Sequence, residues 1–448
     1  MRDVLSHQIH TIQDSRQPSK TAYSLHDSYM SGFALFFLQD PSLLEFQRRF
    51  HERLQRNNLS TVFGIKDIPG DSQLRDVIDE HDYEPLNEVF GEYFRRLQRG
   101  KHLEAYRYLG KYYLVTIDGT EYFGSEKIHC ERCLRSEKKG VVRYFHHIVQ
   151  ATVVHPGKRQ VIPLVPEFIR NTERGDTQDC EINAGKRLIP KLRAAHRQLP
   201  MVVVGDSLYS KDPFIRLLKQ QGMRFILGVK PKDHKSLTED IEGLRRGGLL
   251  EKYEWKDTKG SCYRYEWVNE IALNGHLKGE VVNYIEFRIL NAEGEQTYHN
   301  SWATDIEVNA ENVKDLVKGG RARWKIENEG FNTLKNHGYH LERHPRGISD
   351  AAVCFVGSGA PADELTSPTC VSGLNEGFHT HTHAGGKESA SWAVLFRQGT
   401  TIFSTSDYRA YALFDSLFFE VKSVQGSVLS PIINSSQRIA VTGGECLL

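Results

Sequence analysis

The sequence predicts an α/β protein with a mixed sheet, a β-rich insertion and a helical N-terminal domain. The first observation is a set of short apolar runs rich in β-branched and aromatic residues, at 112–118, 142–154, 160–165, 201–206 and 223–229. The second is that helical periods at 180–196 and 213–221 separate the last three runs, and this alternation is typical of an α/β domain. The third is a β-rich stretch over about 233–305, with candidate strands at 263–273, 281–290 and 297–304.

The region before the sheet divides into two parts. Residues 1–30 are polar and aperiodic, which predicts a loose polar arm. Residues 31–110 are expected to form a helical N-terminal domain, because an Asp-Pro-Ser helix start at 40–42 precedes an apolar stripe of helical period. Four arginines crowd the remaining faces of that helix: Arg48, Arg49, Arg53 and Arg56. They form either a solvated face or a DNA-binding face.

Composition narrows the class of protein. The 448 residues carry a net charge of +1, so a polyanion site would have to come from local clustering of basic residues. No apolar run is long enough to span a membrane, and the N-terminus has no apolar signal segment. Seven cysteines, an odd number in a chain of this length, argue against a disulfide framework. A reducing, cytoplasmic setting is expected.

Two carboxylates are predicted to follow buried strands, each in a Gly-Asp or Asp-Gly pair. They are Asp118 and Asp206. Open α/β sheets place ligand sites beside the carboxyl ends of their strands, and carboxylate oxygens suit Mg²⁺ or Mn²⁺. The alternative is that each aspartate only caps the turn that follows.

A third carboxylate, Glu327, belongs to an amphipathic stretch from Gly320 to His344. Arg323, Glu327 and Lys335 are predicted to lie along one helix face. The carboxylate would hold a divalent cation, and the two basic side chains would hold phosphate oxygens. The alternative is a surface helix with an Arg323–Glu327 ion pair.

Together, three stretches resemble the DDE-type transposases of bacterial insertion sequences. They are DGTEYFGSEKIHC (118–130), GDSLY (205–209) and RWKIENEGFNTLK (323–335). The resemblance is to the group with a Tyr/Arg/Glu/Lys signature around the catalytic Glu. It covers about residues 30–345, with further similarity in IPGDSQLRDVID (68–79), DCEINAGKRL (179–188) and LGVKPKDH (227–234).

This resemblance implies an RNase H-like catalytic core over 111–345, with the β-rich insertion ahead of the catalytic Glu. It implies that Asp118, Asp206 and Glu327 are the catalytic residues and bind two Mg²⁺ or Mn²⁺ ions. Arg323 takes the signature Arg position, but the signature Tyr falls at Gly320 and is missing. Lys335 lies one residue further from the Glu than the pattern expects. Glu329 is the fallback third ligand.

The resemblance also implies that Trp302 holds a flipped base, with a core tryptophan as the alternative. Lys230 is a candidate phosphate contact or a solvated lysine. The segment HCERC (129–133) offers three soft ligands for a structural zinc without a clear fourth.

The expected function is therefore DNA transposition. A homodimer would hold the terminal inverted repeats of its element, hydrolyse a phosphodiester and transfer the 3′ end to double-stranded target DNA. The setting would be the bacterial cytoplasm, at the nucleoid, with no membrane partner. Two alternatives stay open: a catalytically inactive DNA-binding remnant, and a metal-dependent nuclease without strand transfer.

The last segment, 346–448, differs in character. Charged residues become sparse, and no helical or strand period lasts. A shifted reading frame or a disordered chain would explain the change. The exceptions are a His-Thr-His-Thr-His run at 379–383, either a metal site or a polar loop, and one aromatic cluster with helical potential: Tyr408, Tyr411, Phe414, Phe418 and Phe419.

Overall fold

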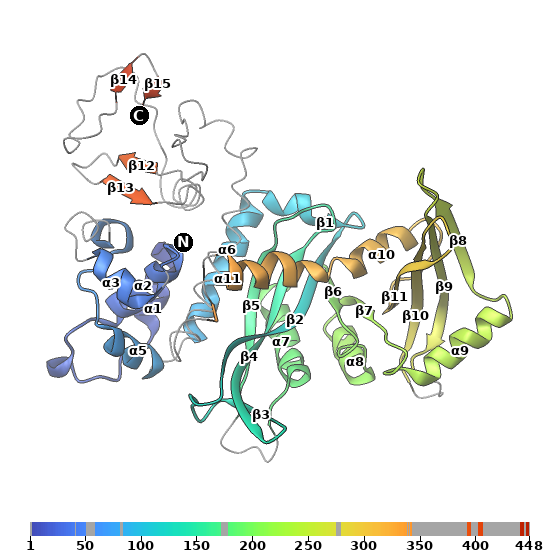
Figure 1. Ribbon diagram of the computed structural model, residues 1–448, viewed down its shortest axis with the longest axis horizontal. Helices are drawn as coiled ribbons and strands as arrows, with labels where there is room; N and C mark the ends of the chain where they lie inside the picture. Colours follow the sequence, from blue (N-terminus) through green and yellow to red (C-terminus); the bar gives the residue numbers. More distant parts are fainter. Residues whose placement is uncertain are drawn as a thin grey trace. The chain divides into compact units, whose positions relative to one another are not determined.

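The computed structural model describes most of the chain up to Glu342 and four short strands beyond it (Figure 1). The described residues are 2–40, 42–50, 59–80, 84–171, 178–274, 279–337, 339, 341–342, 392–395, 402–405, 440–442 and 445–447. They fall into two compact units: Met1–Val89 with Asn336–Leu448, and Phe90–Lys335. Each unit is described by itself.

The first unit is helical over its described N-terminal residues. Its helices are α1 (Arg2–Thr11), η1 (Pro18–Lys20), α2 (Leu25–Phe37), α3 (Leu43–Phe50), η2 (Leu59–Phe63), α5 (Asp71–Glu80) and η3 (Glu84–Asn87). The expectation of a loose arm over residues 1–30 is wrong. Leu5 and Ile9, one helical turn apart, are buried, and the almost wholly buried α2 starts at a Ser24 cap, whose side chain accepts the Asp27 N–H.

The basic face expected on α3 is partly neutralised by carboxylates. Arg49 donates to the buried Asp40 at 2.8 Å, and Arg48 pairs with Glu45. Arg53 and Arg56 lie outside the described residues. The division between the units falls inside α6 (Glu88–Arg99), so the expected domain end at residue 110 does not coincide with it.

The second unit is built on one large sheet. Its strands are β1 (Arg107–Tyr108), β2 (Tyr112–Ser125), β3 (Leu134–Lys138), β4 (Val141–Val154), β5 (Ile162–Ile169), β6 (Met201–Gly205), β7 (Arg224–Gly228), β8 (Glu251–Lys256), β9 (Cys262–Ala272), β10 (Val281–Leu290) and β11 (Gln296–Thr304). The main order is β3-β4-β2-β6-β7-β11-β10-β9-β8, with β5 also paired to β4. The prediction of a mixed α/β sheet is confirmed.

The centre of this sheet combines parallel and antiparallel pairs. β4 is antiparallel to β2 and to β5, whereas β6 is parallel to both β2 and β7. β6 is buried along its whole length, as its unbroken Met-Val-Val-Val run predicts for a strand covered on both faces. The insertion continues the sheet, because β11 pairs antiparallel with β7.

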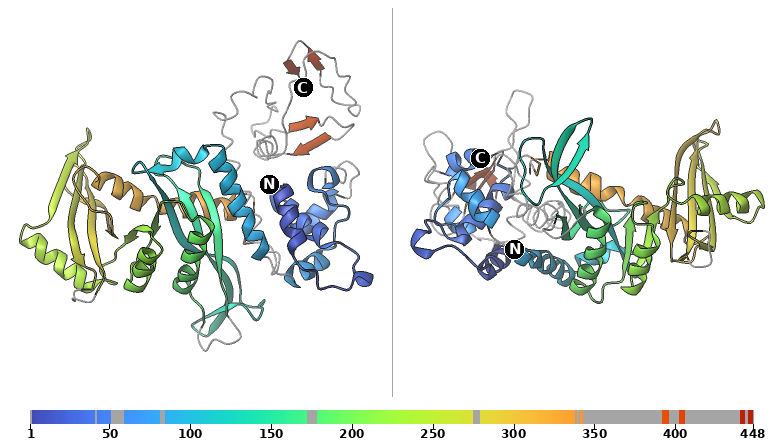
Figure 2. Two further views of the ribbon diagram at one scale, coloured as in Figure 1. Left: turned by 180° about the vertical axis from the view of Figure 1, so that it is seen from behind. Right: turned by 90° about the horizontal axis from the view of Figure 1, so that it is seen from below.

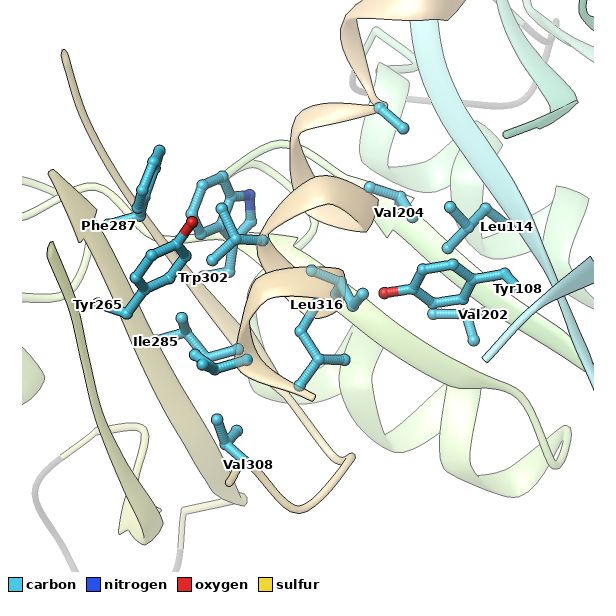
Figure 3. Close-up of a cluster of buried hydrophobic side chains, with 14 of the residues drawn as sticks. Tyr108, Leu114, Val202, Val204, Tyr265, Ile285, Phe287, Trp302, Val308 and Leu316 are labelled. Atoms are coloured by element: carbon cyan, nitrogen blue, oxygen red, sulfur yellow. The ribbon is translucent and has the colours of Figure 1, made fainter. Parts of the chain in front are cut away.

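After α6, the helices of this unit pack on both faces of the large sheet. They are η4 (His102–Tyr106), α7 (Glu181–Ala195), α8 (Asp212–Gln220), α9 (Lys235–Arg246), α10 (Val313–Arg321), η5 (Ile326–Phe331) and α11 (Asn332–Asn336). α7 and α8 lie on one face and α10 on the other (Figures 1 and 2). Under α10, Leu114, Val202 and Val204 form part of an apolar core with Leu316 (Figure 3).

The insertion contains two elements that the sequence did not predict, α9 and β8. Arg245 of α9 reaches over the sheet and pairs with Glu266 on β9 and Glu286 on β10, which are both buried. Despite its burial, which raises the pKa, Glu286 has a pKa lowered to about 2 by His299, Arg288 and Arg245. This ion network fixes α9 against the insertion strands.

The described residues beyond 342 form two separate two-stranded sheets. One pairs β12 (Trp392–Leu395) with β13 (Ile402–Thr405), and the other pairs β14 (Ala440–Thr442) with β15 (Glu445–Leu447). The histidine run and the aromatic cluster expected in this segment lie outside the described residues. Across the described part of the chain, no helix has the length and apolar character that crossing a membrane requires.

Candidate active site

Asp118 and Asp206 come from adjacent parallel strands. Thr116 of β2 and Val204 of β6 are the last paired residues of the two strands, and each aspartate lies two residues further along the chain. The two aspartates share the side-chain phase of Leu114, Val202 and Val204, which face α10. The sequence predicted that Asp118 would lie at the end of its strand, but the structure places it in the middle of β2. β2 continues to Ser125 because β4 remains paired beside it. Asp118 instead lies where the parallel partner β6 ends.

Glu327 reaches the same place from the η5 helix. Nη1 of Arg323 lies 2.5 Å from Oδ2 of Asp118 and 3.1 Å from Oε1 of Glu327. The alternative of a simple surface ion pair is therefore incomplete, since Arg323 also reaches across 205 residues of sequence to the sheet. The guanidinium supplies the positive charge between two of the three predicted catalytic carboxylates.

Burial and crowding make this cluster electrostatically costly. The pKa of Asp118 is raised to about 7, first by burial and then by Glu327 and Glu181, although Arg323 opposes the shift. A carboxylate with a pKa that high favours either a proton or a bound cation. Among the described residues, no choice of one carboxylate oxygen from each of Asp118, Asp206 and Glu327 brings the three atoms within 4.8 Å of one another.

A fourth carboxylate, Glu181, was not predicted from the sequence. It is the first residue of α7, and its Oε1 accepts a hydrogen bond from the Tyr209 hydroxyl at 2.9 Å. Burial raises the pKa of Glu181, and the charge of Asp206 raises it further. Its side chain lies against Gly119, where an added Cβ would be 2.4 Å from Oε2. A side chain at residue 119 would therefore displace the end of the Glu181 side chain.

The helix that carries Glu327 is locally π-helical, which the sequence did not predict. Hydrogen bonds in a π-turn span five residues instead of four, so the turn holds one extra residue. η5 covers Ile326–Phe331, so it contains Glu327 and ends before Lys335. The extra residue of this π-turn compensates for the Glu327–Lys335 spacing, which is one residue longer than in the family pattern.

Lys335 lies close to His147 on β4. Its charge lowers the pKa of His147, which burial also lowers. His147 pairs with Glu121, three residues along β2 from Asp118, or about 10 Å at the usual strand rise. Arg143, which pairs with Glu121, adds further positive charge there.

Gly320, at the position of the missing signature tyrosine, packs directly on Trp302. A Cβ at residue 320 would lie 2.6 Å from Nε1 of that indole. The space that a side chain at 320 would need is therefore filled by the tryptophan. Trp302 itself is only 2% exposed and belongs to the apolar core (Figure 3).

The interpretation of Trp302 as a holder of a flipped base is thus wrong, and the core alternative is correct. A ring enclosed by Ile285, Leu316 and Gly320 cannot stack on a base. An exposed aromatic does lie beside the carboxylates. Trp324 is 51% exposed, and the guanidinium of Arg323 lies 5.0 Å from its ring centre.

The two remaining candidates point elsewhere. Glu329 pairs with Arg159 at 3.5 Å, away from the Arg323 contact that Glu327 makes, so it does not replace Glu327 in this arrangement. Lys230 is exposed just after β7, in a turn whose Asp233 accepts a hydrogen bond from Ser207 at 2.8 Å. Since Ser207 follows Asp206, Lys230 is near the strand ends that carry the site.

Comparison with known proteins adds no assignment. No protein-family model matches the chain, and no curated protein is significantly similar to it.

Proposed function

We propose that the chain is a DDE-type DNA transposase whose metal-binding residues are Asp118, Asp206 and Glu327. The observation that carries the proposal is the meeting of Asp118 and Glu327 at Arg323, with Asp206 directly after the neighbouring parallel strand β6. Asp118 and Glu327 thus come together from distant parts of the sequence, and the three carboxylates follow one another along the chain in the order that the resemblance implies. Asp206 also caps the turn that follows it, since its Oδ1 accepts the Leu208 N–H at 2.8 Å, but a turn cap alone does not explain the contact of Arg323 with both Asp118 and Glu327.

The strand order supports an RNase H-like core for this proposal. Following the chain, β2, β4 and β5 form an antiparallel set, and β6 and β7 are then added parallel on the other side of β2. The first carboxylate is on the first long strand, the second follows the fourth, and the third is on the closing helix. The insertion lies between β7 and that helix, as the resemblance implies.

Asp118, Asp206 and Glu327 would hold two Mg²⁺ or Mn²⁺ ions, and such a metal pair would supply activation of the attacking oxygen and charge stabilisation of the leaving 3′ oxygen. Without metal, Arg323 neutralises Asp118 and Glu327. With metal bound, Arg323 would be released to contact a phosphate oxygen of the DNA. Glu181, held by the Tyr209 hydroxyl, lies against Gly119, the residue that follows Asp118. Lys335 and Lys230 contact flanking phosphates, which orients the DNA without reading its sequence.

The proposal extends to the first unit and to assembly. The helices around α3 bind the terminal repeats of the element, and two chains act together because two ends are processed. The dimer works on DNA in the bacterial cytoplasm.

The test uses DNA that surrounds the reading frame, placed on both sides of a marker in a plasmid. With purified protein and Mg²⁺ or Mn²⁺, we expect nicks that leave 3′-OH groups at two outer sites, followed by joining of those ends to a second plasmid. Neither product should form in EDTA. Sequencing of the new junctions locates both events.

Two outcomes would favour the alternatives. Sequence-specific binding without any nick in either metal would indicate a catalytically inactive remnant. Nicks without joined product, even with pre-cleaved ends, would indicate a metal-dependent nuclease without strand transfer.

A further inference from the structure

A second cluster of metal-ligand side chains lies outside the carboxylate site. Cys130 and Cys133 belong to the loop between β2 and β3, and His146 is on β4. One ligand atom from each lies within 4.8 Å of the others, and both cysteines are free thiols. Cys133 and His146 are each 5% exposed, and Cys130 is half-buried.

The distances in this cluster are close to those of a zinc site. The two Sγ atoms are 3.6 Å apart, and His146 Nε2 lies 3.3 Å from Cys130 Sγ and 3.2 Å from Cys133 Sγ. Usual Zn–S and Zn–N bond lengths give tetrahedron edges of about 3.8 Å between sulfurs and about 3.6 Å between sulfur and nitrogen. A disulfide would need sulfurs at about 2.05 Å.

The backbone and the neighbouring rings hold the three groups in place. The loop turns tightly, since the Cys133 N–H donates to the Cys130 carbonyl and the Cys130 N–H donates to Cys133 Sγ. The rings of Tyr122 and Phe123 pack on the His146 imidazole at 5.7 and 5.6 Å. Burial raises the pKa of the Cys130 thiol, but His146 and Cys133 outweigh it and leave the pKa below its usual value.

The sequence pattern had indicated His129 as the imidazole ligand. In the structure, His129 instead stacks on Tyr144 with ring centres 4.4 Å apart, and it is not part of the cluster. His146 comes from the β4 register, which places it opposite Phe123 of β2. A ligand brought in by strand pairing cannot be found from the spacing of the cysteines alone.

We propose that Cys130, Cys133 and His146 bind one Zn²⁺ ion per chain, with water in the fourth position on the half-exposed side of Cys130. Two thiolates and an imidazole in a tetrahedral arrangement select zinc among common cellular divalent ions. The ion clamps the β2–β3 loop onto β4, at the outer end of the strand that carries Asp118. The inference is independent of the proposed function.

The test measures metal in the full chain, purified without chelators. We expect about one zinc per chain by mass spectrometry of the metal content, lost in Cys133→Ser and in His146→Ala. Cys262→Ser is the matched control, because Cys262 is an equally buried thiol on β9 of the insertion, and it should keep the zinc. Cobalt exchanged into the unaltered protein should show thiolate charge-transfer absorption.

A labelling experiment on the unaltered protein avoids the question of whether the variants fold. Cys130 should resist alkylation until a chelator removes the metal, whereas the exposed Cys180 should react in both states. Zinc absent from the purified protein and not taken up on titration would overturn the proposal. So would full zinc retention in a Cys133→Ser/His146→Ala double variant, or alkylation of Cys130 that no chelator changes.

Discussion

Asp118→Asn and Asp206→Asn should each lower the rate of metal-dependent DNA cleavage by about 10³-fold or more. Asparagine keeps the shape of the side chain but removes the charge that holds the cation. This loss of cleavage rate should exceed the roughly 10- to 100-fold loss that is typical when a residue hydrogen-bonded to a metal ligand is removed. Single-turnover cleavage of the plasmid substrate, with Mg²⁺ and with Mn²⁺, measures the effect.

The control for these variants is Asp315→Asn. Asp315 is half-exposed on α10, where it pairs with Lys318, and its neutralisation should leave the cleavage rate unchanged. DNA binding should survive in all three proteins, because phosphate contacts come from basic groups. If Asp118→Asn and Asp206→Asn lose binding and thermal stability along with cleavage, the two aspartates are structural and the proposed site is wrong.

The second large effect separates two glutamates on one helix. Glu327→Gln should abolish cleavage to the same extent as the aspartate variants, since its carboxylate reaches Arg323 and, through it, Asp118. Glu329→Gln should change the rate less than about fivefold, because its partner Arg159 is largely exposed and such a pair contributes at most about 1 kcal/mol. The two rates are measured on the same DNA under identical metal conditions.

The opposite result has a definite meaning here. Full activity in Glu327→Gln, with activity lost in Glu329→Gln, would make Glu329 the third ligand. The helix would then have to rotate from the arrangement that places Arg323 between Asp118 and Glu327.

The sequence predicted the central strands well because their signal is local. β6 and β7 are short apolar runs that read as buried strands on their own. β8 was missed because its sequence, EKYEWK, alternates charges with aromatics at an exposed sheet edge. α1 was missed because only Leu5 and Ile9 mark its buried face.

The candidate site could be predicted only in part. Asp118, Asp206 and Glu327 were indicated by their places relative to predicted strands and by the resemblance. Glu181 and His146 were not, since each reaches its cluster through packing or strand register. The π-turn at η5 was also missed, because an apolar period does not reveal a hydrogen-bond shift from four to five residues.

The most direct measurement of the central claim is a count of Mn²⁺ ions bound by the zinc-replete protein, by electron paramagnetic resonance. Free Mn²⁺ loses its signal on binding, so titration gives the number of sites. The account predicts about two ions per chain, and none in an Asp118→Asn/Asp206→Asn double variant that remains folded. Equal Mn²⁺ binding by the double variant and the unaltered protein would contradict the claim that these carboxylates hold the catalytic metals.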